Sequence, residues 1–131
     1  MPGVYGVSND SLDTPWPKLA STKTAFHALL NGGASDPTAD LFALLSDRNR
    51  PADDLLPSTG VGPDWERLLS SAFIASDDYG TRSSTVVLAG RDAGIIFIER
   101  TFGRRGEPSP EARFQFRADV NLFQPSKKEE S

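Results

Sequence analysis

The chain has 131 residues, the length of one ordinary domain. Its formal net charge of −4 and its pI near 4.9 argue against the basic face on which nucleic-acid-binding proteins depend. It contains no cysteine, which excludes disulfides, thiolate metal sites and a cysteine nucleophile within it.

Neither a membrane span nor a leader is visible in the sequence. No apolar run approaches the ~18–20 residues that cross a bilayer. The opening residues, MPGVYG, lack the basic and apolar regions of a signal peptide. We therefore expect a cytoplasmic or otherwise intracellular protein with no transmembrane segment and no nucleic-acid partner.

The first quarter of the chain predicts a short strand and then a helix. Residues 4–7 predict the strand, and the polar pair Asn9-Asp10 predicts the turn that ends it. Pro17 suits the first position of a helix, because its missing N–H costs nothing there. The helix is expected to end near a glycine pair at residues 32–33, and its apolar stripe consists of Leu19, Phe26, Leu29 and Leu30.

Two more helices are expected before residue 75. The second is capped by Ser35-Asp36-Pro37, ends before Pro51 and is expected to bury Leu41, Leu44 and Leu45. Pro63 opens the third, which has the clearest helical periodicity in the chain. Its apolar positions are Trp65, Leu68, Leu69, Ala72 and Phe73, and Trp16 and Trp65 are expected to lie in the core.

The remaining elements are expected to be strands. Residues 85–89 and 95–98 predict a hairpin around a turn at 90–94, and both strands are apolar on both faces. Residues 104–110 predict a mobile loop, and residues 113–117 alternate like a strand with one wet face. Residues 1–120 would then form one domain, and residues 121–131 a disordered tail.

Helices followed by antiparallel strands predict an α+β fold. A hairpin that is apolar on both faces needs a cover on each side. The three expected helices supply one cover, and the sequence offers nothing for the other.

Familiar catalytic motifs are absent: the sequence has no nucleophile elbow, phosphate loop, zinc-binding HExxH or Rossmann glycine pattern. The single histidine, His27, falls within an expected helix, where such a residue is usually an ordinary surface position.

Two polar segments have both a functional and a structural interpretation. The amide of Asn9, at the end of the expected strand, suits stabilisation of an oxyanion, but it equally suits an Asx turn. Arg82 enters an apolar strand and needs partners for its five donors. It either points into a pocket, where it binds a carboxylate or carbonyl, or pairs with the acids Asp77 and Asp78.

Four motifs follow one another along the chain: GVSN with LDTPWPK at residues 6–9 and 12–18, LPSTGV at 56–61, YGTRSST at 79–85 and ERTF at 99–102. In this order they resemble NRDE-domain proteins, the transport-and-Golgi-organisation family. The resemblance covers residues 3–103 and, more loosely, 111–118. It implies the C-terminal part of an αββα sandwich like that of N-terminal-nucleophile hydrolases, with antiparallel strands and three helices.

The same resemblance implies that part of the fold is missing. Family members begin Met-Cys and carry an Asn-Arg-Asp-Glu motif soon after, and neither feature occurs here. In the N-terminal-nucleophile hydrolases that the family resembles, the nucleophile is residue one of the mature chain. Asn9 then corresponds to an oxyanion-hole donor, and Arg82 to an arginine that orients the nucleophile or substrate. The chain alone is expected to have no catalytic activity, and its expected partner is a missing N-terminal half or a second copy.

Several functions remain open at this point. The resemblance implies roles in Golgi organisation, secretion or haem movement; for haem, His27 and Met1 are poor axial ligands, and no cofactor or metal is expected otherwise. One alternative is half of a split amidohydrolase that needs a Met-Cys partner. A more remote one is a tautomerase with Pro2 as its base, once Met1 is removed.

Overall fold

A computed structural model describes residues 2–118, so the tail expected at 121–131 lies outside the described residues. Over that part of the chain, helices come first and strands second. The order is α1 Pro17–Asn31, α2 Thr38–Leu45, a 3-10 turn Asp53–Leu55, α3 Pro63–Leu68, β1 Ser83–Ala89, β2 Gly94–Phe102, a 3-10 turn Arg104–Gly106 and β3 Pro108–Arg117. The α+β class with antiparallel strands and three helices is confirmed.

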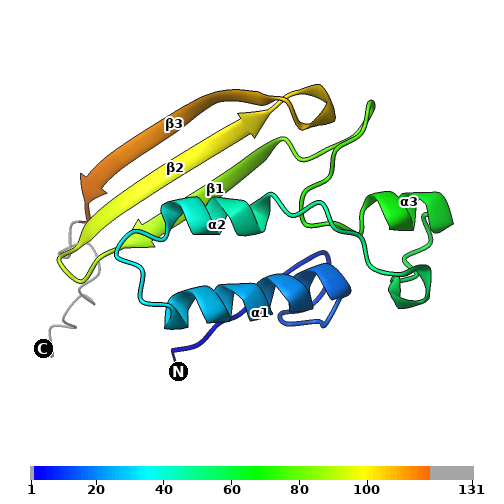
Figure 1. Cartoon of the computed structure of the whole chain (residues 1–131), viewed down its shortest axis with the longest axis horizontal. Coiled ribbons are helices and arrows are strands. Elements are labelled where there is room, and N and C mark those ends of the chain that lie inside the picture. Colours follow the sequence, from blue (N-terminus) through cyan, green and yellow to red (C-terminus); the bar gives the residue numbers. More distant parts are fainter. Residues whose placement is uncertain (1, 119–131) are drawn as a thin grey trace, which may run out of the picture.

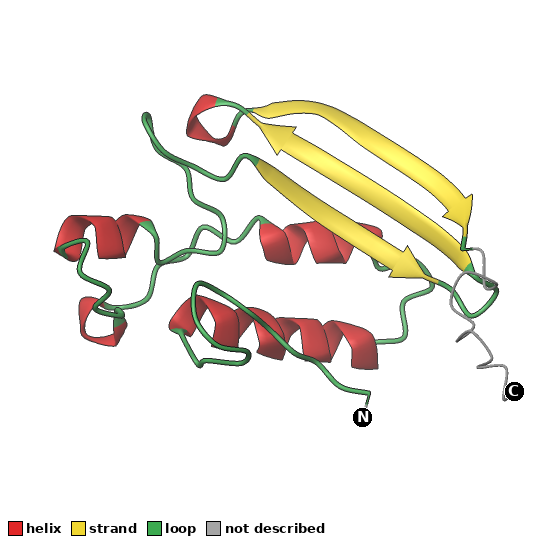
Figure 2. Ribbon diagram, turned by 180° about the vertical axis from the view of Figure 1, so that it is seen from behind, coloured by secondary structure: helices red, strands yellow, loops and turns green. Residues whose placement is uncertain are grey.

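The three strands form one sheet in the order β1-β2-β3, with both neighbouring pairs antiparallel. Figure 1 shows α2 alongside β1, and α1 on the far side of α2. The view from behind in Figure 2 shows the same arrangement, with the long strands on one side and the helices on the other. Helix α2 therefore lies between the sheet and α1, and it packs against both.

The core lies between α2 and one face of the sheet. Phe42 of α2, Val86 of β1 and Ile98 of β2 are at most 5% exposed, and the guanidinium of Arg100 lies 3.9 Å from the centre of the Phe42 ring. The sequence pattern predicted the half-buried neighbours Leu41, Leu44 and Leu45 but missed Phe42. Leu41, Phe42 and Leu45 share one helical face, and that face meets the sheet.

The expected strand at residues 4–7 is wrong for this structure, because the segment is extended but pairs with no described strand. A tight reverse turn follows it instead. The N–H of Asp13 donates to the Gly6 carbonyl at 2.7 Å, and the Asp13 carboxylate accepts from the Gly6 N–H at 2.7 Å. Gly6 itself lies so close to α1 that a Cβ there would come within 2.8 Å of Leu19. The absence of a side chain lets the segment lie against the helix.

The third helix is shorter than its periodicity indicated, since it ends at Leu68. Phe73 is buried, as a core residue should be, but lies beyond the helix. Trp65 is 47% exposed, so its assignment to the core is wrong. The periodicity predicts which face of α3 is apolar but not how deeply that face is buried. Trp65 packs edge-on against Tyr79, with ring centres 5.5 Å apart.

The strands also differ from expectation. Residues 104–110 are not a free loop, because a 3-10 turn at Arg104–Gly106 leads directly into β3 at Pro108. In β1, buried positions alternate with exposed ones, although its sequence is apolar on both faces. The residues on its second face, Val87 above all at 56% exposure, have no covering layer among the described residues.

Candidate functional site

A pocket that includes Asn9, called the Asn9 pocket below, lies between the start of α1, the loop before α3, and α3 itself. It has a volume of about 200 Å³. It brings together two of the sequence motifs, at residues 6–18 and 56–61, with α3 and the two residues after it. The lining residues used below are Asn9, Trp16, Lys18, Thr59, Glu66 and Leu69. Of these residues, Asn9 was expected from the sequence to act in a site; Lys18, Thr59 and Glu66 were not.

Lys18 supplies the positive charge of this pocket. It lies in the first turn of α1, and its Nζ donates to the Leu69 carbonyl at 2.8 Å, just after α3 ends. Burial lowers the pKa of the Lys18 ammonium below its usual range. An ammonium has three donors, so two remain beyond the one that Leu69 accepts. The contact joins α1 to α3 and leaves donors for an acceptor atom in the pocket.

Glu66 supplies the negative charge. It is 7% exposed, and its Oε1 accepts from both the N–H and the hydroxyl of Thr59, each at 2.6 Å. The hydroxyl and then the N–H of Thr59 hold the pKa of the Glu66 carboxyl below its usual range. Glu66 thus stays ionised and fixes the 56–61 loop against α3. The sequence gave no signal for this contact, because Glu66 falls in a helix and its partner Thr59 in the turn-rich loop before it.

Asn9 sits at the rim of the pocket, in the loop that Asp13 closes. The Asp13 carboxylate accepts from Lys23 Nζ at 2.8 Å as well as from Gly6 N–H, and these two contacts lower its pKa. The Asn9 side chain is exposed and takes part in none of the hydrogen bonds among residues 2–118. Together, the Asn9 amide and the Lys18 ammonium provide donors of the kind that stabilise a carbonyl or carboxylate oxygen.

Arg82 lies elsewhere. It lines a second hollow of about 460 Å³ with Asp77, Asp78 and Tyr79, at the start of β1. Asp77 pairs with Arg105, and its carbonyl accepts from Arg104 at 3.1 Å. Within the described chain, neither acid bonds to the Arg82 guanidinium, so the structural interpretation of Arg82 fails there. Asn9 and Arg82 therefore line separate pockets, and their joint action in one site stays a prediction.

The remaining candidate ligands do not form a cofactor site. His27 is exposed on α1, with Nδ1 3.2 Å from the amide nitrogen of Asn31, and it lines neither hollow described above. An axial haem ligand needs a pocket for the macrocycle, so His27 does not fit that group. Across residues 2–118, no three His, Asp or Glu side chains are grouped closely enough to hold a metal ion. None of the helices described is long and apolar enough to cross a bilayer.

Comparison with known proteins adds independent information. A family profile described as "Transport and Golgi organisation 2" matches residues 1–104. The chain is 37% identical over 109 residues to the "Transport and Golgi organization protein 2 homolog" of Bos taurus, a match covering 76% of this chain and 39% of the relative. The human homologue of the same name is 32% identical over 107 residues, with the same coverage. The chain thus spans about two-fifths of the length of these curated relatives.

Proposed function

This chain belongs to the Transport and Golgi organisation 2 family, and we propose that it acts as a non-catalytic part of a larger fold. In that fold, the open face of its sheet is covered by protein that these 131 residues do not contain. Through the complete fold the chain would take part in transport and Golgi organisation, the role that the names of its relatives state. The wider roles of the resemblance, secretion and haem movement, belong to the same proposal.

The observation that carries the proposal is the apolar open face. Val87, Phe97 and Phe114 lie side by side across the three strands, because β1 and β2 pair at 87↔97 and β2 and β3 at 97↔114. The rings of Phe97 and Phe114 meet with centres 6.2 Å apart. Next to them, Ile95 pairs with Phe116. Val87, Phe114 and Phe116 are each at least 50% exposed. Contiguous exposed apolar surfaces of this kind mark interaction sites.

The relatives give a source for the cover. Each extends well beyond the region that this chain matches, since the match covers 39% of the relative. In an αββα sandwich, which the NRDE resemblance implies, a second sheet packs on the first. The open face of β1, β2 and β3 is where this second sheet would lie.

Co-expression tests the proposal directly. The 131-residue chain is produced with the part of the bovine relative outside the matched region, and retention on the tagged chain is measured. We expect wild-type chain to retain its partner, and the double variant Phe114→Ser, Phe116→Ser to lose it. Gln115→Ser, which changes the intervening residue on the opposite face, is the matched control. Equal retention by the double variant would refute docking through this face.

A cellular assay tests the role. In cells that lack their own family member, the chain together with the partner part is expected to restore Golgi morphology, whereas the chain alone is not. Restoration by the chain alone would contradict the view that it is one part of a larger fold.

A second candidate function is half of a split amidohydrolase, favoured by the donors of Asn9 and Lys18 in the Asn9 pocket. The Met-Cys nucleophile of this hypothesis would come from the partner, since the chain has no cysteine. In the two-part protein, Asn9→Ala and Arg82→Ala are each expected to abolish amide hydrolysis while leaving the melting temperature unchanged. Undiminished hydrolysis by both variants would reject their roles.

A further inference from the structure

The helical layer of this fold is wider than the sheet. Helix α2 packs against β1, and α1 packs against α2, but α1 makes no comparable contact with any strand. None of the residues of α1 is buried, although Leu19 and Phe26 lie on its apolar stripe. Figure 1 shows α1 lying past the edge of β1. Helix α1 therefore extends beyond the sheet that the described strands form.

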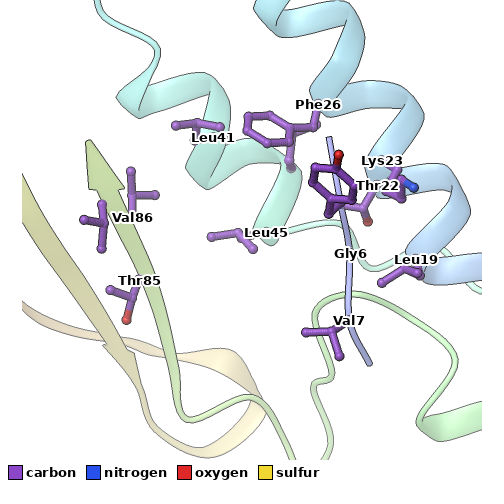
Figure 3. Close-up of a pocket in the computed structure, with 13 residues that line it drawn as sticks. Gly6, Val7, Leu19, Thr22, Lys23, Phe26, Leu41, Leu45, Thr85 and Val86 are labelled. Carbon is purple, nitrogen blue, oxygen red and sulfur yellow. The ribbon is translucent and has the colours of Figure 1, made fainter. Parts of the chain in front are cut away.

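A groove of about 290 Å³ occupies this place. Figure 3 shows Gly6 and Val7 on one side of it and Thr85 and Val86 on the other, with Leu45 of α2 between them. Leu19 and Phe26 of α1 also line the groove. It is thus an apolar groove with extended backbone along both sides and with α1 and α2 forming its floor.

The hydrogen bonding of β1 shows which of its backbone groups face this groove. The Phe102 N–H donates to the Arg82 carbonyl at 2.9 Å, and the Gly90 N–H donates to the Gly94 carbonyl at 2.8 Å. Both pairs continue the β1–β2 register. Bonded pairs alternate in an antiparallel ladder, so the even-numbered residues of β1 bond to β2. The N–H and C=O groups of Thr85 and Val87 consequently point to the free edge.

The two edges of the sheet are built differently. β3 carries Pro108, Pro110 and three charged residues, Glu111, Arg113 and Arg117, which are features that prevent unwanted strand pairing. β1 has no proline and no charge in its sequence SSTVVLA. An edge strand of seven residues that carries neither charge nor proline is a template for another strand. This difference favours pairing at β1 and not at β3.

Across the groove, Gly6 and Val7 face opposite sides of their segment, as successive residues of a strand do. Gly6 faces α1, while Val7 is 69% exposed on the other side of the segment. Gly6 directs its N–H and C=O to Asp13, which does not line the groove. Because backbone groups alternate along an extended chain, those of Val7 point away from Asp13.

A second copy of this chain does not fit the groove. Antiparallel pairing of two β1 edges would place both helical layers on the same side of a continuous sheet. Each α1, which extends past its own β1, would then occupy the space that α2 of the other copy takes beneath its β1. The occupant must be a strand without a helix directly beneath it.

We infer that a strand from the part of the family fold outside this chain inserts between β1 and residues 4–7. This rests on the proposed function and names where that outside part enters the sheet. The strand bonds to the backbone groups of Thr85 and Val87, and its alternate apolar side chains rest on Leu19, Phe26 and Leu45. Residues 4–7 then become the next strand, as their sequence predicted.

Proline scanning of the two edges tests the insertion, with the non-matching part of the bovine relative as the probe. Thr85→Pro removes an N–H that faces the groove and no bond to β2. Thr85→Val changes the same side chain but keeps that N–H. Gln115→Pro is the edge control: the Ala118 N–H donates to the Ala93 carbonyl at 2.8 Å, which makes the odd-numbered N–H groups of β3 point outward.

We expect Thr85→Pro to weaken binding of the probe about tenfold or more, and Thr85→Val and Gln115→Pro to bind like wild type. Hydrogen exchange on wild-type chain is the second measurement, and it needs no variant to fold. The Thr85 and Val87 amides are expected to exchange fast in the chain alone and to become protected in the complex.

The outcomes separate the two proposals. Wild type that binds the probe with Thr85 and Val87 still unprotected, or a folded Thr85→Pro that binds equally well, overturns the strand insertion alone. Wild type that fails to bind the probe overturns the proposed function, and the insertion with it.

Discussion

At position 66, a carboxylate stays charged although it is almost out of solvent, because Thr59 gives it two short hydrogen bonds. These bonds lower the pKa of the Glu66 carboxyl in the folded protein relative to its ordinary value of 4.5. A depressed folded pKa stabilises the fold above the unfolded value, and this stabilisation is lost as the pH falls through the folded value. The contact should therefore matter at pH 7 and disappear in acid.

Glu66→Gln is expected to lower the melting temperature at pH 7 by a few degrees and to have a smaller effect near pH 3. Thermal unfolding of both proteins at several pH values measures this. Glu107→Gln, at an exposed position, is the control and should leave the melting temperature unchanged at either pH. An equal loss for Glu66→Gln at pH 7 and pH 3 would show that shape, and not charge, holds the 56–61 loop.

At the scale of the elements, local patterns predicted well what depends on nearby residues. Pro17 and Pro63 mark the starts of α1 and α3, and the hairpin of β1 and β2 lies where the turn at 90–94 indicated. Failures came where an element depends on a distant partner. Residues 4–7 have strand-forming side chains but belong to no sheet among residues 2–118, and no local pattern reports that.

The candidate site shows the same contrast between what nearby residues determine and what distant partners determine. Asn9 and Arg82 were found from their motifs, but the sequence could not show that they line separate pockets. Lys18 was visible only as part of a motif. Its role depends on the Leu69 carbonyl, 51 positions along the chain.

Burial predicts opposite results for two aromatic residues in the helices. Phe42→Ala is expected to cost about 3–5 kcal/mol, because the ring is 2% exposed and packs on Val86 and Ile98. Trp65→Ala is expected to cost only about 0.5–1.5 kcal/mol, from the lost edge contact with Tyr79. Denaturant unfolding of the two variants measures the free energies. A larger loss for Trp65→Ala would mean that α3, and not α2, anchors the core.

At the scale of the whole molecule, the described part of the chain covers one face of the sheet and leaves the other open. The sequence predicted a missing cover because β1 and β2 are apolar on both faces, and the structure places the open side opposite α2. It could not predict that β1 is an edge strand of the sheet formed by residues 2–118, since strand order is a property of the assembled sheet. An uncovered face and an unprotected edge together predict how the isolated chain behaves in solution.

The isolated chain is expected to self-associate and to bind a hydrophobic dye such as anilinonaphthalene sulfonate. Phe114→Ser with Phe116→Ser should lower dye fluorescence, because both rings lie on the open face and are at least 50% exposed. Leu30→Ser is the matched control: Leu30 is 54% exposed but lies on α1, and dye binding should not change. Sedimentation measures the self-association. A monomer that melts sharply and binds no dye would instead show that this part of the fold is stable alone. Its open sheet face would then need no covering layer.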